Sequence, residues 1–147
     1  MAAATMHSYF ILILAAVSAF ALWKGGRDER LVAVTCIMGT IGTHFAISPL
    51  HERYANVEFG VTVVDCLVLA GFVIVALRSM RFWPLWVSGL QLTTVMGHIM
   101  KGVDLELLPV AYGAALTLWS YPIILILFIG TWRSMRRWQE QPPSLVG

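Results

Sequence analysis

Five apolar runs separated by short polar stretches organise the chain. They cover about residues 8–23, 31–50, 59–77, 82–100 and 107–130. Each run has close to the roughly 20 residues that an α-helix needs to cross a hydrocarbon core of about 30 Å, although the first run is shorter. The pattern predicts an all-α integral membrane protein, in which residues 1–138 form a bundle of five transmembrane helices. Residues 139–147 are predicted to be a disordered tail, since they carry Pro142 and Pro143 and few apolar side chains.

Positively charged residues follow every other apolar run. Eight of the ten Lys and Arg residues come after the first, third and fifth runs: Lys24, Arg27, Arg30, Arg78, Arg81, Arg133, Arg136 and Arg137. Only Arg53 and Lys101 follow the second and fourth runs. Because short loops rich in Lys and Arg stay in the cytoplasm, the pattern predicts an N-terminus outside and a cytoplasmic C-terminus.

Tryptophan placement agrees with this orientation. Amphipathic indole rings prefer the boundary between membrane and water. Five of the six tryptophans fall at the predicted cytoplasmic boundary: Trp23, Trp83, Trp86, Trp132 and Trp138. The charge pattern and the aromatic pattern therefore predict the same topology.

Composition excludes several other classes of protein. The chain is 59% hydrophobic and only 12% charged, whereas soluble domains are about a quarter charged. Its net charge of +2 comes with basic residues spread over three clusters beside the membrane, so no nucleic-acid partner is predicted. The expected partner is the lipid bilayer. Cys36 and Cys66 fall at different predicted depths, which argues against a disulfide bond between them.

Polar side chains on the three middle runs repeat at steps of three and four residues, which places them on one face of each helix. These stripes are Cys36, Thr40, His44 and Ser48; Glu58, Thr62 and Asp65; and Gln91, Thr94, His98 and Lys101. The first and fifth runs carry no ionisable residue inside. We therefore expect the first and fifth helices to face lipid.

The predicted depths of three ionisable residues suggest a site. From a rise of about 1.5 Å per residue, His44 and Asp65 lie about 9 Å below the outer edge and His98 within about 5 Å of it. Asp and His inside membranes are rare and usually face the bundle interior or a wet cavity. The sequence thus predicts a site in the outer third of the bundle, formed by Asp65, His44, His98, Thr40, Thr62 and Gln91.

This cluster is compatible with four kinds of role. Asp65 with His44 could bind a proton or a small ligand in a pocket open to the outside. His44 and His98 could be the axial ligands of a haem, and both together with Asp65 could hold a divalent metal such as Zn²⁺. In the fourth role, the same groups only join helices by hydrogen bonds. No nucleophile elbow, phosphate loop or redox motif occurs, so the sequence favours a protein without enzymatic activity.

Three functions follow from these roles. The first is a non-enzymatic membrane protein that binds a partner, a small ligand or a proton through the outward-facing pocket. The second is an accessory or assembly subunit of a larger membrane complex, because the loops are short and the chain has little mass outside its helices. The third is a haem- or metal-binding membrane protein. Five spans are too few for a transporter built from repeated halves, so transport would require a homo-oligomer.

Three segments carry a resemblance to known proteins. They are Trp23-Lys24-Gly25-Gly26-Arg27, Arg81-Phe82-Trp83-Pro84-Leu85-Trp86, and Trp119-Ser120-Tyr121-Pro122 with Gly130-Thr131-Trp132-Arg133. In these segments the chain resembles a group of small polytopic inner-membrane proteins of unknown function from Gram-negative bacteria. The resemblance implies a multi-pass protein of the bacterial inner membrane and assigns no role to any residue.

Overall fold

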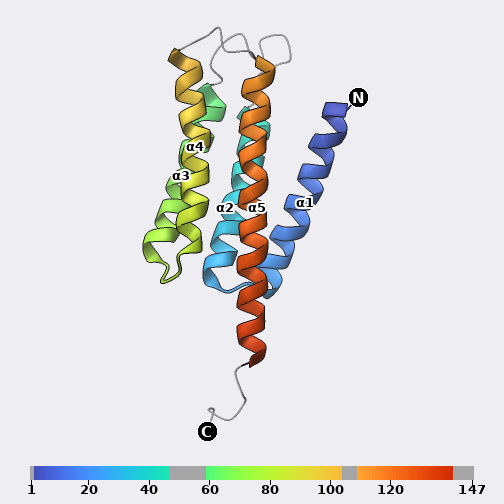
Figure 1. Cartoon of the computed structure of the whole chain (residues 1–147), viewed down its shortest axis with the longest axis vertical. Helices are drawn as coiled ribbons and strands as arrows, with labels where there is room; N and C mark the ends of the chain where they lie inside the picture. Colours follow the sequence, from blue (N-terminus) through green and yellow to red (C-terminus); the bar gives the residue numbers. More distant parts are fainter. Residues whose placement is uncertain (1, 47–58, 104–108, 141–147) are drawn as a thin grey trace.

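The computed structural model describes residues 2–46, 59–103 and 109–140, and the side chains of residues 8–46, 59–100 and 118–140. This part of the chain is entirely helical (Figure 1). Its helices are α1 (Ala2–Lys24), α2 (Arg27–Ala46), α3 (Phe59–Arg78), α4 (Trp83–Val103) and α5 (Pro109–Glu140). The prediction of an all-α fold with five helices is therefore confirmed. Positions 47–50 and 107–108 of the predicted second and fifth spans lie outside the described residues.

Several helices extend beyond the predicted runs, and two of these extensions are rich in charged residues. α2 begins at Arg27, so the charged residues 27–30 belong to its first turn rather than to a loop. α5 continues to Glu140, two residues into the predicted tail. Acidic residues at the start of α2 interact favourably with the helix dipole. A helix can therefore begin in this charged segment.

The helices form a closed ring. Each helix packs against the next one along the chain, α5 packs back against α1, and α2 also touches α5. Leu127 and Val87 are fully buried, and they share the central apolar cluster with Ala21, Val32, Ala33, Phe72, Val75 and Ile123. The expectation that the fifth helix faces lipid is wrong along this buried side, because α5 packs against three other helices.

Glycines set the close packing of α2 on α3. A Cβ atom added to Gly39 would lie 2.6 Å from Val68 Cγ2, and one added to Gly42 would lie 3.2 Å from Val64 Cγ1. On α3, a Cβ at Gly71 would lie 2.9 Å from Thr35 Cγ2. Side chains at these positions would force the two helices apart. The small residues thus fix which side of α2 meets α3.

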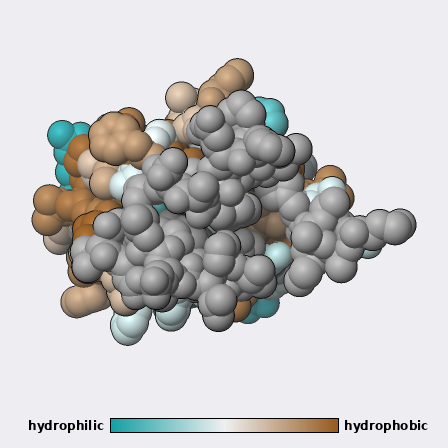
Figure 2. Space-filling model, turned by 90° about the horizontal axis from the view of Figure 1, so that it is seen from above, coloured by the Kyte–Doolittle hydropathy of each residue, from teal (hydrophilic) through white to brown (hydrophobic). Residues whose placement is uncertain are grey.

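Large apolar side chains cover the outside of the bundle. Exposed examples occur on every helix: Leu12, Phe45, Leu67, Trp86 and Phe128. In the view from above, apolar residues are visible around the rim (Figure 2). Within the described residues, two helical segments are long and apolar enough to cross a membrane, Phe59–Arg78 with mean hydropathy 2.5 and Leu118–Glu140 with 1.2. The described part of α1, Ser8–Lys24, is apolar but shorter.

Candidate functional site

Asp65 on α3 is held between two side chains of α4. His98 Nε2 lies 2.8 Å from Asp65 Oδ2. Gln91 Nε2 donates a hydrogen bond of 3.0 Å to Asp65 Oδ1 and lies 3.4 Å from the Asp65 backbone oxygen. Both carboxylate oxygens are therefore engaged by α4. We call these three residues the Asp65 cluster.

The stripe on α4 explains how the cluster assembles. Gln91, Thr94 and His98 follow steps of three and four residues, and all three are buried. They face α3 because a helix turns about 100° per residue, which returns the same face after seven residues. Thr62 lies one turn before Asp65 on α3 and is half-buried with interactions of its own. The predicted meeting of Asp65, Gln91 and His98 is therefore found in the structure.

Burial makes the pairing of Asp65 with His98 chemically important. His98 is 3% exposed and Gln91 6%, while the Asp65 side chain is 18% exposed. Burying a polar group there without a hydrogen-bond partner costs free energy of folding. A hydrogen bond that is formed there is strengthened by the low local dielectric. The carboxylate and the imidazole can share one proton, as an ion pair or as a neutral pair. Gln91 holds the carboxylate in the orientation that makes this possible.

The residues predicted from α2 lie outside the Asp65 cluster. His44 is exposed, and its ring packs edge-on against Phe45 with ring centroids 6.1 Å apart. Thr40 donates its hydroxyl to the Cys36 carbonyl on its own helix at 2.9 Å. Gly42 and Ala46 face α3, and a residue two positions from each is turned away by about 200°. The glycine face of α2 thus directs His44 away from α3.

Within the described residues, this placement gives the metal and haem hypotheses no geometric support. The described residues contain no group of three or more His, Cys, Asp or Glu side chains that could hold a metal ion. The predicted ligand set of His44, Asp65 and His98 needs His44, which is not in the cluster. The haem arrangement needs His44 and His98 to face one another, but His98 is turned towards Asp65 on α3.

A second polar cluster lies at the opposite end of the bundle, and the sequence analysis missed it. Glu29 in the first turn of α2 is fully buried and forms an ion pair with Arg81, which is one-third exposed. Its neighbour Asp28 accepts a hydrogen bond of 2.6 Å from the Ser79 hydroxyl, and Ser79 Oγ accepts one of 3.1 Å from the Arg81 amide. These contacts join the start of α2 to the turn between α3 and α4.

Glycines make room for Glu29. A Cβ on Gly25 would lie 2.8 Å from Glu29 Cβ. A Cβ on Gly26 would lie 2.9 Å from Glu29 Oε2 and 3.4 Å from Ser134 Oγ on α5. Glu29 Oε2 and Ser134 Oγ are both buried, and neither has a hydrogen-bond partner among the described residues. The available sequence signal was the Gly25-Gly26 pair shortly before the acidic residues Asp28 and Glu29.

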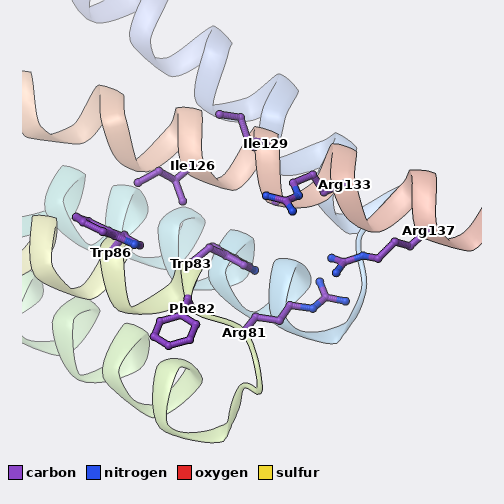
Figure 3. Close-up of a pocket in the computed structure, with 9 residues that line it drawn as sticks. Arg81, Phe82, Trp83, Trp86, Ile126, Ile129, Arg133 and Arg137 are labelled. Carbon is purple, nitrogen blue, oxygen red and sulfur yellow. The ribbon is translucent and has the colours of Figure 1, made fainter.

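A groove of about 440 Å³ lies beside this second cluster, between α4 and α5 (Figure 3). Its lining residues come from the turn before α4, the start of α4 and the second half of α5: Arg81, Phe82, Trp83, Trp86, Ile126, Ile129, Gly130, Arg133 and Arg137. Gly130 allows the indole of Trp83 to approach α5, since a Cβ there would lie 3.3 Å from Trp83 Cε2. Three arginines and three aromatic rings thus share one cavity.

No protein family, curated protein or solved structure was found to match this chain.

Proposed function

We propose that the protein is a multi-pass membrane protein in which all five helices cross the bilayer, with the N-terminus outside and the C-terminus in the cytoplasm. The helices lie side by side (Figure 1), and their outer faces are apolar. α2 and α4 are less apolar than α3, but many of their polar side chains face other helices. Glu29, Gln91, Thr94 and His98 are all buried. A neighbouring helix can shield such residues from lipid. The mean hydropathy of a single helix does not take this shielding into account.

The proposed orientation predicts the result of reporter fusions. A fluorescent protein that folds only in the cytoplasm should be bright when fused after Gly147, and an alkaline phosphatase that is active only outside should be inactive there. Fusions after Arg53 should give the opposite pair of results. Fusions after Arg27 serve as a cytoplasmic control. Active phosphatase at the C-terminus would reject the orientation, and equal results after Arg27 and Arg53 would reject the crossing of α2.

Within this topology, we infer that the protein is non-enzymatic and binds a proton, or a small polar ligand that replaces it, at the Asp65 cluster. The observation that supports this proposal is the contact of 2.8 Å between Asp65 and the buried His98. An acid and a base in hydrogen-bond contact can take up or release a proton with little movement. The orientation places this pair in the outer half of the membrane, and the resemblance noted above favours the bacterial inner membrane.

Ionisable residues lie near His98 on its own helix and on neighbouring helices. On α4, Lys101 comes three positions after it, and His98 takes part in a further interaction besides its contact with Asp65. From α3, Asp65 contacts it directly, and Cys66 is the next residue in sequence. α5 packs on α4 as well, and residues 109–132 contain no Asp, Glu, Lys, Arg or His, although they include Tyr112 and Tyr121. Asp65 is therefore the charged residue on a neighbouring helix that contacts His98.

Histidine NMR on the purified full chain tests this proposal. With labelled imidazoles, the His98 signal, assigned through His98→Gln, should change with pH, as expected for a site that takes up a proton. In Asp65→Asn that change should differ from the change in the native protein, because the carboxylate that contacts His98 is absent. The exposed His44 is the internal control, and its signal should be the same in both proteins.

A second function, an accessory subunit of a larger membrane complex, is favoured by a different aspect of the same contacts. Asp65, Gln91 and His98 satisfy one another across the α3–α4 interface, as purely structural groups would. The NMR experiment separates the two functions. A His98 signal that stays constant over the whole pH range, in both the native protein and Asp65→Asn, contradicts proton binding and supports the structural role.

A further inference from the structure

We propose that the groove between α4 and α5 binds the headgroup of an anionic phospholipid, with the phosphate held by Arg133, Arg137 and Arg81. The inference rests on the proposed membrane topology, which places this groove at the cytoplasmic edge of the bilayer. There the apolar part of the groove would face acyl chains and its arginine end would face the headgroups. Basic pockets between transmembrane helices on the cytoplasmic side are typical sites for anionic lipid headgroups.

Charge is the first observation that supports this ligand. Arg133 and Arg137 are one helical turn apart on α5, and both are exposed. In the described part of the chain, Glu29 is the acidic residue paired with Arg81, and neither Arg133 nor Arg137 has an ion pair. Three guanidinium groups and one carboxylate leave two positive charges in excess. Figure 3 shows the three arginines gathered at the same end of the groove.

The indole of Trp83 is an independent observation. Its Nε1 atom is buried and has no hydrogen-bond partner among the described residues. In Figure 3 this nitrogen points towards the end of the groove where the arginines lie. An indole N–H can only donate, so a phosphate oxygen satisfies it and a cation does not. A small movement of the exposed arginine side chains would bring a bound phosphate within its reach.

The remaining walls favour a lipid over a soluble anion. Phe82, Trp86 and Ile129 are exposed, and Ile126 is half-buried behind them. The groove volume of about 440 Å³ falls within the range of about 300–1,000 Å³ that is usual for ligand pockets. An inorganic phosphate would leave the aromatic and aliphatic walls exposed. A phospholipid covers them with its glycerol and first methylene groups while its phosphate meets the arginines.

Lipid retention by the full chain in detergent tests the proposal. Native mass spectrometry should show that the protein retains phosphatidylglycerol in preference to the zwitterionic phosphatidylethanolamine. Arg133→Gln combined with Arg137→Gln should weaken phosphatidylglycerol binding about 30-fold, because each basic residue near such a headgroup contributes about a fivefold factor. Arg81 is left intact in this variant because it also pairs with Glu29.

Arg27→Gln combined with Arg78→Gln is the matched control, since it removes the same charge from two exposed residues at the same end of the bundle. Its binding should stay within about threefold of the native protein, as expected for unspecific attraction alone. Equal weakening by both double variants would overturn the groove as the site. Displacement of the lipid by inorganic phosphate at equal concentration would overturn the lipid as the ligand. Micelles impose no topology, so either result is independent of the reporter fusions and of the His98 titration.

Discussion

Replacement of Arg81 by alanine should lower the free energy of unfolding by about 3–5 kcal/mol, which is the usual cost of leaving one member of a buried ion pair alone. Glu29 has no exposed surface, and Arg81 is its ion-pair partner. Without Arg81, the carboxylate must either stay charged and uncompensated in the interior or take up a proton. Unfolding in mixed micelles with increasing dodecyl sulfate, followed by helical circular dichroism, measures the change.

Two further variants make this result specific. Arg78→Ala removes an exposed arginine from the end of α3 and should change the stability by less than about 0.5 kcal/mol. Glu29→Gln combined with Arg81→Gln removes both charges and should recover a large part of the loss, because no charge is then left buried. If Arg81→Ala lowers the free energy of unfolding as little as Arg78→Ala does, the ion pair does not stabilise the start of α2.

The second large effect is expected from Asp65→Ala. This change removes the acceptor of Gln91 and one partner of His98 at once, and both side chains stay buried. A buried polar group that loses its partner costs about 1–3 kcal/mol. Because His98 keeps a further interaction, its cost is smaller than that of Gln91, and the expected total loss is about 2–4 kcal/mol. Asp65→Asn keeps a carbonyl oxygen that can accept the Gln91 bond, and should cost less than Asp65→Ala.

The same micelle titration measures these variants. Thr93→Ala is a suitable control on α4, since Thr93 is exposed and its hydroxyl bonds only to the Gly89 carbonyl of its own helix. Thr93→Ala should leave the free energy of unfolding nearly unchanged. Equal stabilities of Asp65→Ala and Thr93→Ala would show that the Asp65 cluster contributes nothing to the packing of α3 on α4.

Helical periodicity predicted the fold and part of the site. The stripes on α3 and α4 brought Asp65, Gln91 and His98 together because consecutive antiparallel helices joined by a short turn pack against each other. His44 followed an equally regular stripe on α2, yet it is turned away from α3. The face with Gly39 and Gly42 packs there instead. Polar spacing shows which residues share a face, but close packing decides which face is buried.

The ion pair between Glu29 and Arg81 could not be predicted from local sequence patterns, for a different reason. Glu29 and Arg81 are 52 positions apart, and charged residues next to an apolar run are usually solvated. Only the packing of α2 against the α3–α4 turn and α5 buries Glu29. The lack of ionisable residues in the fifth run was similarly misleading, because an apolar helix can fill a core as well as face lipid. Leu127 is fully buried there.

The continuity of α5 has a consequence for the groove. One unbroken helix carries Leu127 in the core and also Arg133 and Arg137 at the cytoplasmic end, where α5 projects beyond the other helices (Figure 1). Each residue inserted or deleted between Leu127 and Arg133 would rotate the arginines by about 100° around the helix axis. They would then leave the side that faces Trp83, although no charge had been lost. The position of these arginines around the axis of α5, as well as their number, determines whether a phosphate can be held.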